Sequence, residues 1–254
     1  GFFSVFTPEA VKKVTLFKSS FPARFGGRLS SVIDVRTNDG DMQKYHGTFS
    51  IGLLTSKINL EGPIIKGKTS FNISARRSYL DLLAKPFMPD DEKYSYYFYD
   101  MNAKINHKFS DRSRMFLSAY HGKDHFAADY DGNTDFKDGS NMGWGNTIVS
   151  ARWNYIFNNR LFSNTTVSYN NYLFDVNAYT NNQYSTGAGA IILNRYSSNY
   201  HSGITDWSYQ IDFDYNPTPA HHIKFGTGYL FHRFQPDVTT SVISDKTDNR
   251  IDRD

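Results

Sequence analysis

The sequence predicts an all-β chain in which an antiparallel sheet of about nine strands forms part of a transmembrane β-barrel. Three observations predict this class. Aromatic residues make up 17% of the 254 residues, although the chain is polar on average, with a mean hydropathy of −0.56. Apolar and polar residues alternate in segment after segment. The connections between these segments are alternately short and long, as in transmembrane barrels with short turns on one side of the membrane and long loops on the other.

The composition also excludes several other classes. No stretch approaches the roughly 18 uninterrupted apolar residues that a spanning helix needs, so a helical membrane protein is excluded. The chain has no cysteine, which excludes a disulfide framework and a thiolate metal site. Its net charge of +3 is small, and its basic residues form no concentrated stripe of the kind that nucleic-acid binding requires. A water-soluble β-sandwich shares much of this profile and stays open as an alternative.

The N-terminal part of the chain is predicted to form a separate unit. Residues 7–9 read Thr-Pro-Glu and predict a very short helix that begins with a threonine N-cap. Residues 13–18 alternate apolar and polar side chains, and the glycines within 21–27 predict a turn. A strand is predicted over 30–37. The Asn-Asp-Gly-Asp sequence of 38–41 predicts a further turn, and we place a domain boundary after it.

From about residue 43 onward the chain is predicted to consist of strands. The alternation is clear in 207–215, where Trp, Tyr, Ile, Phe and Tyr occupy one side and polar residues the other, because side chains change sides at every residue of a strand. The nine predicted strands lie near 43–53, 55–64, 69–79, 96–108, 113–124, 143–157, 160–176, 201–216 and 222–235, with boundaries good to about 2–4 residues.

The lengths of the connections give an independent signal. Four connections are predicted to be tight, at 65–68, 110–112, 158–159 and 217–221. Three are predicted to be long loops, at 80–95, 125–142 and 177–200. The first connection, near Leu54, falls on the long side by alternation but is tight. A sandwich would not show such regular alternation, so the pattern favours a membrane barrel.

Residues 21–37 read FPARFGGRLSSVIDVRT. An Ala-x-aromatic-Gly turn there leads through small residues into a Val-Ile-x-Val-x-Thr strand, at Ala23, Phe25, Gly26, Val32, Ile33, Val35 and Thr37. This segment resembles the C-terminal end of the plug domain of TonB-dependent outer-membrane receptors. It departs from the family pattern at Ser31, where glycine is more common, and at Asp34, where asparagine is. The stretches FPARFGGRLSSV and LEGPI followed by SFNISARRSYLDLL are similar to those of receptors from Bacteroidetes.

The resemblance implies a domain organisation and a function. Residues 1–41 would be the C-terminal part of the plug, and 42–254 the N-terminal portion of a barrel that has about 22 strands in this family. The chain would belong to an active transporter in the outer membrane of a Gram-negative bacterium that imports a siderophore, cobalamin, an oligosaccharide or a peptide. Its implied partners are outer-membrane lipid, that ligand, and the TonB energy-coupling complex acting through a segment outside this chain. A surface lipoprotein is a further candidate partner, whereas no nucleic acid and no cofactor are expected.

Four residues are candidates for contacts between plug and barrel. Arg24 and Arg28 flank the glycine pair of the predicted turn. Strand alternation points Glu61 and Arg76 inward, away from lipid. We expect Arg24 or Arg28 to pair with Glu61 or another inward acid, because charged pairs across a partly wet interface hold a plug firmly yet reversibly. The alternative is that both arginines are merely solvated.

No enzymatic activity and no metal site are predicted. The sequence lacks a G-x-S-x-G elbow, a P-loop and an H-E-x-x-H motif. Residues 129–135 place oxygen donors at alternate positions like the start of a calcium loop, but the twelfth residue is Ser140 rather than a bidentate glutamate. An ordinary polar loop is therefore favoured there. A haem receptor would need an exposed axial histidine, for which His125 or His201 could serve, and this reading is disfavoured.

Two rival functions are distinguishable by structure. In a passive porin-like barrel, residues 1–41 would be an ordinary strand pair rather than a plug. In a soluble β-sheet carbohydrate-binding protein, the aromatic side of 207–215 would pack against a second sheet instead of lying exposed.

Overall fold

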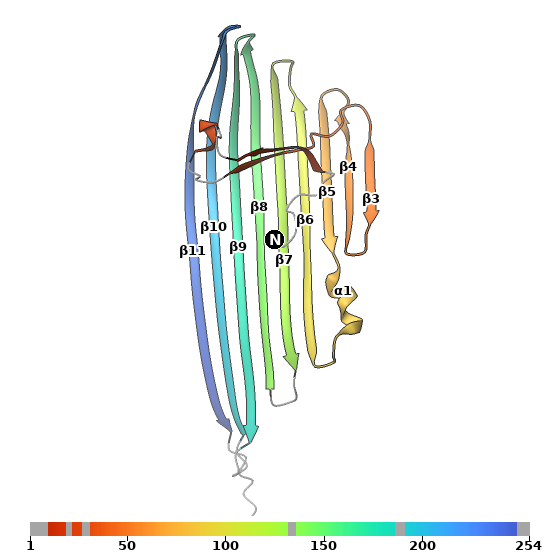
Figure 1. Cartoon of the computed structure of the whole chain (residues 1–254), viewed down its shortest axis with the longest axis vertical. Coiled ribbons are helices and arrows are strands. Elements are labelled where there is room, and N and C mark those ends of the chain that lie inside the picture. Colours follow the sequence, from red (N-terminus) through yellow and green to blue (C-terminus); the bar gives the residue numbers. More distant parts are fainter. Residues whose placement is uncertain (1–9, 19–21, 27–30, 132–135, 186–190, 248–254) are drawn as a thin grey trace, which may run out of the picture.

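The computed structural model describes residues 10–18, 22–26, 31–131, 136–185 and 191–247. They form a two-stranded sheet, which we call the hairpin, and a nine-stranded sheet with the order β11-β10-β9-β8-β7-β6-β5-β4-β3 (Figure 1). All neighbouring strands are antiparallel. The predicted all-β class and the predicted sheet of about nine strands are confirmed.

The elements follow the chain without a crossover. The hairpin consists of β1 (Val11–Phe17) and β2 (Val32–Thr37), with the short 3-10 helix η2 (Ala23–Phe25) between them. The large sheet consists of β3 (His46–Ile51), β4 (Thr55–Ile65), β5 (Thr69–Ser78), β6 (Glu92–Lys108), β7 (Ser113–Asp131), β8 (Phe136–Asn158), β9 (Leu161–Ser185), β10 (Ile191–Thr218) and β11 (His221–Thr247). Between β5 and β6 lie the helices α1 (Leu80–Ala84) and η3 (Lys85–Phe87). No described helix has the length and apolar character needed to cross a membrane. The helix expected at 7–9 lies outside the described residues.

The strands are longer than the sequence predicted. β7 continues to Asp131 and β8 already begins at Phe136, whereas β9 reaches Ser185 and β10 begins at Ile191. The prediction of long loops over 125–142 and 177–200 is therefore wrong for most of both segments. Small and polar residues interrupt the apolar alternation there, but each strand hydrogen-bonds to its neighbour in unbroken register, and this pairing extends the ladder.

The tight connections are as predicted. At the β4–β5 turn, Lys68 N donates to Ile65 O at 3.0 Å, and Gly67 takes a positive φ of 72°. At the β8–β9 turn, the backbone N–H groups of Arg160 and Leu161 donate to the side chain of Asn158. These are the local side-chain and glycine contacts that turn sequences favour. The connection near Leu54 is also short, with Gly52 N donating to Thr55 O at 2.9 Å.

The two faces of the large sheet differ in chemistry. We call the face crossed by the hairpin the inner face and the opposite one the outer face (Figure 1). On the outer face of β10, Trp207, Tyr209 and Tyr215 remain 54%, 43% and 37% exposed, whereas Gln210 and Asp212 line a cavity beneath the hairpin. The predicted alternation is confirmed, and the aromatic side of β10 does not pack against a second sheet in the described structure.

The outer face carries a band that we call the belt. It comprises the outward positions of 149–157, 161–169, 207–215 and 223–231 on β8 to β11, which hold aromatic, aliphatic, Ser and Thr side chains and no charged residue. Beyond the belt, away from the tight turns, the next outward residues are Thr147, Asn171, Thr205 and Arg233. Each belt segment has about the length of 9–11 residues that a tilted strand needs to cross a bilayer.

The aromatic cluster of 94–99 is divided between the two faces of the sheet. Tyr97 and Tyr99 face outward, in register with the outward residues of β7. Phe98 faces inward and is only 5% exposed, with the Arg76 guanidinium 5.0 Å from its ring centroid. The same alternation places Tyr169 outward but Phe174 inward. A contiguous aromatic run cannot form one girdle because successive side chains point to opposite faces.

The buried part of the structure is mainly polar. Among the described aliphatic (other than proline) and aromatic residues, only Ala10, Phe98 and Phe116 are buried. The buried polar set is larger and lies chiefly on the inner face of β4 to β6, with Asn59, Ser70, Asn72, Ser74, Asn102, Lys104 and Asn106 among its members. The hydrophobic effect therefore does not hold the hairpin on the sheet by itself, since the surfaces that meet are hydrogen-bonding and charged.

Candidate functional site

The hairpin is anchored to the sheet by Asp39, which follows the end of β2. The Lys104 ammonium of β6 lies 2.7 Å from Asp39 Oδ1, and both side chains are buried. Arg36 and Lys12 of the hairpin approach Asp39 Oδ2 at 3.2 and 3.3 Å. Removing one member of a buried charged pair costs about 3–5 kcal/mol because the other is left uncompensated. Asp39 is thus the centre of the contact between the hairpin and the sheet.

The charge state of Asp39 follows from this environment. Burial by itself raises the pKa of the carboxyl, but the hydrogen bond and charge of Lys104, with the charges of Arg36 and Lys12, outweigh it. The net result is a pKa below the ordinary value of 3.8. Asp39 is therefore an anion at neutral pH and neutralises a cluster of cations.

Lys104 also holds the end of β2 through the backbone. Its ammonium donates to Thr37 O at 3.1 Å and to Thr37 Oγ1 at 3.2 Å. Ser70 of β5 donates to Asp39 O at 2.8 Å. The donors come from two strands of the large sheet, β5 and β6, so the segment 37–39 is fixed by its main chain as well as by its charge.

The turn after β2 makes a second contact, with β4 and β5. Asn38 Nδ2 donates to Glu61 Oε2 at 2.6 Å, and Asn72 Nδ2 donates to the same oxygen at 3.3 Å. Gly40 has a positive φ of 76°, and a Cβ there would lie 2.2 Å from the carbonyl oxygen of Phe71. Only glycine permits both this conformation and this approach of two backbones.

The far end of the hairpin reaches β10 more loosely. Gln210 Nε2 donates to Arg24 O at 3.4 Å. The Arg24 guanidinium lies 3.9 Å from Asp34 of β2, an exposed pair within the hairpin unit. Exposed pairs of this kind contribute little, so the strong contacts are at the Asp39 end.

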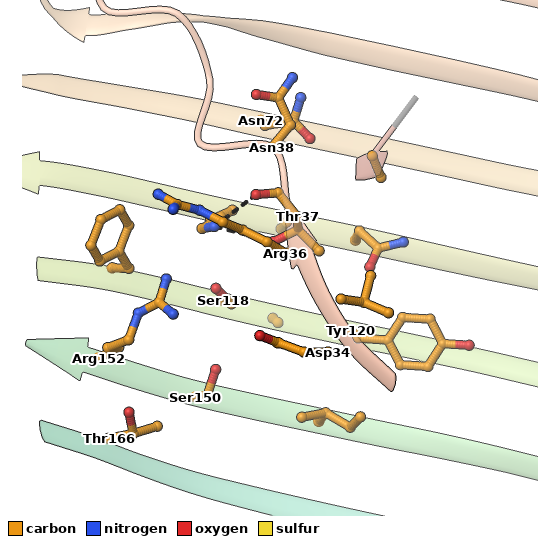
Figure 2. Close-up of a pocket in the computed structure, with 18 of the residues that line it drawn as sticks. Asp34, Arg36, Thr37, Asn38, Asn72, Ser118, Tyr120, Ser150, Arg152 and Thr166 are labelled. Atoms are coloured by element: carbon orange, nitrogen blue, oxygen red, sulfur yellow. Dashed lines mark hydrogen bonds between the residues drawn. The ribbon is translucent and has the colours of Figure 1, made fainter. Parts of the chain in front are cut away.

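A cavity of about 500 Å³ lies between the hairpin and the inner face (Figure 2). Arg36 and Asp34 extend into it from the hairpin, and Arg152, Ser118 and Ser150 line the wall. Aligned residues on four strands form a row of serines, Ser118, Ser150, Ser168 and Ser208. These small side chains leave room for the hairpin to cross the sheet.

Cations gather around one ring at the edge of this cavity. Phe116 is 4% exposed, and the charged groups of Lys104, Arg114 and Arg152 lie 5.3, 5.2 and 4.8 Å from its ring centroid. A ring face attracts cations, which helps to hold three like charges together. Arg152 Nε is buried and has no hydrogen-bond partner among the described residues.

The four residues predicted as plug–barrel contacts have different positions. Glu61 contacts the hairpin, through Asn38 rather than through an arginine. Arg24 is near Asp34, and Arg28 lies outside the described residues. Arg76 pairs with Asp100 of the neighbouring strand at 2.6 Å.

Sequence reasoning missed Asp39 and Lys104. Asp39 lies in an Asn-Asp-Gly-Asp sequence, and turn formation alone is a sufficient reason for these residue types. Alternation does place Lys104 on the inner face of β6, where an unpaired lysine would be costly. The inward position of Lys104 thus indicated that this lysine needs an acidic partner, but it did not identify Asp39 as that partner.

The described residues contain no group of three or more His, Asp or Glu side chains arranged to hold a metal ion. Of the stretch considered as a calcium loop, residues 132–135 lie outside the described structure. Asp129 accepts a hydrogen bond from Tyr179 at 3.0 Å, and Asp131 pairs with Lys137 at 3.2 Å.

Comparison with known proteins gives matches only among solved structures. No protein-family model matches the chain, and no curated protein does. A mutant of the ferric enterobactin receptor PfeA from Pseudomonas aeruginosa is 9% identical, with a TM-score of 0.48, over 90% of this chain and 46% of that one. The siderophore receptor PirA from Acinetobacter baumannii is 10% identical, with a TM-score of 0.38, over 95% and 46%. The ferric yersiniabactin uptake receptor FyuA from Yersinia pestis is 12% identical, with a TM-score of 0.35, over 91% and 49%. The chain spans about half the length of these structures, and none of these values establishes a family for it.

Proposed function

We propose that this chain is part of a TonB-dependent outer-membrane receptor that imports a scarce ligand through a plugged barrel. Residues 1–41 would be the end of the plug and 42–254 the first part of the wall. One observation carries the proposal: a hairpin is held by buried charges on the polar face of a sheet whose other face is uncharged and aromatic over the height of a bilayer.

The distribution of polarity supports a membrane wall over a soluble sheet. A soluble sheet hides its apolar face and exposes its polar one. Here Trp153, Trp207 and Phe231 remain about half exposed, while the hairpin crosses the polar face. Lipid on the outer face would remove that exposed apolar area from water, as in membrane barrels.

The hairpin contacts support a plug over a simple strand pair. The Asp39–Lys104 pair and the Asn38–Glu61 hydrogen bond join segments that are separate in the sheet topology. Both are polar contacts that water can replace when the hairpin moves. In this proposal Glu61 is a plug contact, and Arg24 lies in the plug turn. Arg76, through Asp100, keeps the wall rigid beside it.

Conductance distinguishes the three candidate functions. The full-length protein is inserted into a planar bilayer, as the natural sequence and with residues 10–41 deleted. If the protein is a plugged transporter, the natural sequence should not conduct, and the variant that lacks residues 10–41 should form a large pore. A passive porin conducts already, and the deletion changes its conductance little. A soluble carbohydrate-binding protein gives no channel in either form.

The chemistry of the inner face beyond the hairpin favours one class of ligand. Its inward positions include Trp144, Phe174 and Tyr200, and the rings of the last two lie 6.0 Å apart in a T-shaped arrangement. The described inward positions of 92–98, 122–130, 138–146, 172–180, 196–204 and 234–242 hold no Lys, Arg or His, but they include Glu92, Asp124 and Asp138.

An inner face with aromatic side chains and no basic ones favours an uncharged ligand with flat apolar faces, such as an oligosaccharide or an apolar peptide. It disfavours an anionic iron chelate. Tryptophan fluorescence of the full-length protein, titrated with neutral oligosaccharides and with a ferric catecholate, tests this preference. Tighter binding of the catecholate would contradict it.

A further inference from the structure

Basic and aromatic residues meet on the outer face of β5 to β8, directly beyond the belt. Arg77, Tyr99 and Lys123 are in register across β5, β6 and β7. Since neighbouring strands lie about 4.8 Å apart, the Cα atoms of Arg77 and Lys123 are separated by about 10 Å. The Arg77 side chain is 55% exposed, and Lys123 is exposed as well.

Glycines on β8 leave room beside these cations. Gly145 is in register with Lys123, and Gly143 is the next outward residue of β8. A Cβ on Gly143 would lie 3.7 Å from Lys123 Cε, so the lysine stem extends across the glycine surface. A Cβ on Gly145 would come within 2.9 Å of Gly122 O. The cation therefore lies over glycines, with no side chain of β8 at either position.

Rings hold this surface in place. The rings of Tyr97 and His125 stack at 4.9 Å, and those of Tyr99 and His121 lie 5.8 Å apart. The Arg77 guanidinium is 5.4 Å from the Tyr97 ring centroid. The imidazole of His121 is also hydrogen-bonded to Thr147 Oγ1 at 2.9 Å.

The positive charge of the patch is poorly compensated. Lys123 forms no ion pair or hydrogen bond within the described part of the chain. Arg77 approaches Asp81 of α1 at 3.4 Å, a partly exposed pair of small strength. Asp175 of β9, the acid beside Gly143, is hydrogen-bonded to His201 of β10.

We propose that this patch binds the phosphate group of an anionic membrane lipid. We call it the headgroup site and define it by Arg77, Tyr99, His121, Lys123 and Gly145. Three features favour a lipid over a soluble anion. The site begins at the first outward residues beyond the uncharged belt, at the level of the headgroups of a surrounding bilayer. It pairs bases with tyrosine rings, which prefer the membrane interface. It also faces outward, away from any transport path.

The inference rests on the proposed membrane location but not on the transported ligand. Each Lys or Arg near an anionic membrane surface contributes about 1 kcal/mol, which corresponds to roughly a fivefold change in affinity. The lipid chains would lie along the outer face next to the site, at Leu117 of β7 and at Val149 of the belt, which are 45% and 50% exposed.

Native mass spectrometry of the full-length protein in neutral detergent tests the site. The protein is titrated with phosphatidylglycerol and, separately, with phosphatidylcholine. We expect one phosphatidylglycerol to be retained in preference to phosphatidylcholine. Lys123→Gln and Arg77→Gln should each weaken that binding about fivefold, whereas Lys123→Arg should keep it. The matched control is Arg195→Gln, which removes a charge from the outer face of β10 farther from the belt.

Several outcomes would overturn the proposal. Equal retention of the two lipids is one, and unchanged binding by Lys123→Gln is another. Displacement of the lipid by millimolar inorganic phosphate would assign the site to a soluble anion. Heat-dependent gel migration checks that each variant still forms a barrel. A folded barrel without lipid preference defeats only this inference, whereas a protein that stays soluble without detergent defeats the proposed function.

Discussion

At the scale of single residues, the hairpin depends on one carboxylate among many cations. Asp39 is surrounded by Lys104, Arg36 and Lys12, and Arg152 lines the same cavity as Lys104 and Arg36. A neutral side chain at position 39 would leave these positive charges together in a partly buried space. Repulsion among them would then oppose docking, whereas the natural carboxylate favours it.

We therefore predict that Asp39→Asn loosens the hairpin, with a loss of up to about 3–5 kcal/mol of docking free energy. Because the chain has no cysteine, nitroxide labels can be placed on Leu16→Cys in β1 and Asn199→Cys in β10 without background. The distance distribution between them should be narrow in the natural protein and broad in the variant.

The control for this measurement is Asp34→Asn, which removes only the exposed pair with Arg24 and should change docking by less than about 1 kcal/mol. The double variant Asp39→Asn/Lys104→Met should be less affected than Asp39→Asn alone, since it also removes the uncompensated ammonium. A narrow distribution in Asp39→Asn would contradict the role of this residue.

The lowered pKa of Asp39 predicts that docking of the hairpin depends on pH. The pKa of Asp39 is lowered in the docked state from its ordinary value of 3.8, so docking favours the anion. Its contribution is complete at pH values above 3.8 and is lost as the pH falls through the lower docked-state value. The label distance should stay constant from neutral pH to about pH 5 and broaden only below about pH 4. In Asp39→Asn this acid-dependent step should be absent, and its persistence would assign the transition to another group.

At the scale of elements, the strands were predictable because alternation is a local property. The positions of Trp207 and Ser208 on opposite faces follow from the period of two alone. The lengths of the strands were not predictable to the same degree. Beyond the belt, the outward face of β10 contains Thr205, Gly203 and His201, and such a polar stretch is compatible with a loop or with an extended ladder. Pairing with β9 and β11 decides between them, and pairing is a long-range interaction.

The candidate site was less predictable for the same reason. The sequence placed Glu61 and Arg76 on the inner face, and both are there. It could not pair Asp39 with Lys104, because the register between the hairpin and the sheet is fixed by contacts between segments 65 residues apart in numbering, 39 against 104. Local turn chemistry at 38–41 was sufficient to explain that sequence, so it concealed the ionic role.

The belt predicts a difference between two faces of one strand. Thr227 is the middle outward residue of 223–231, and Leu230 faces inward on the same strand. An arginine at a lipid-facing midplane position costs about 2–4 kcal/mol, whereas a lumenal one costs much less. We therefore expect Thr227→Arg to lower the free energy of unfolding in lipid bilayers by about that amount, and Leu230→Arg to lower it by less. Urea unfolding in vesicles measures both, and equal effects would argue against lipid on the outer face.

At the scale of the whole molecule, the strands extend far beyond what a membrane crossing needs. β10 has 28 residues, which at about 3.3 Å per residue gives a length of about 90 Å. A crossing uses only about 9–11 of them. The remainder of β7 to β11 would stand outside the bilayer and carry the aromatic inner surface described above. In the proposed barrel, the long strands would build a tall vestibule on the side away from the tight turns.

The sheet of the described residues also has two open edges, at β3 and β11. In lipid, an unpaired backbone group costs several kcal/mol, so a membrane wall must close. We predict that in the full-length protein both edges are hydrogen-bonded to further strands. Hydrogen exchange of the bilayer-inserted protein measures this on β11, where alternate N–H groups of 223–231 point toward β10 and the others point away. Both sets should be protected to a similar degree if the barrel closes. In a soluble open sheet, the set that points away from β10 would exchange quickly, because water reaches a free edge. A resolved difference between the two sets would therefore exclude a closed wall at β11, whatever the lipid behaviour of the outer face.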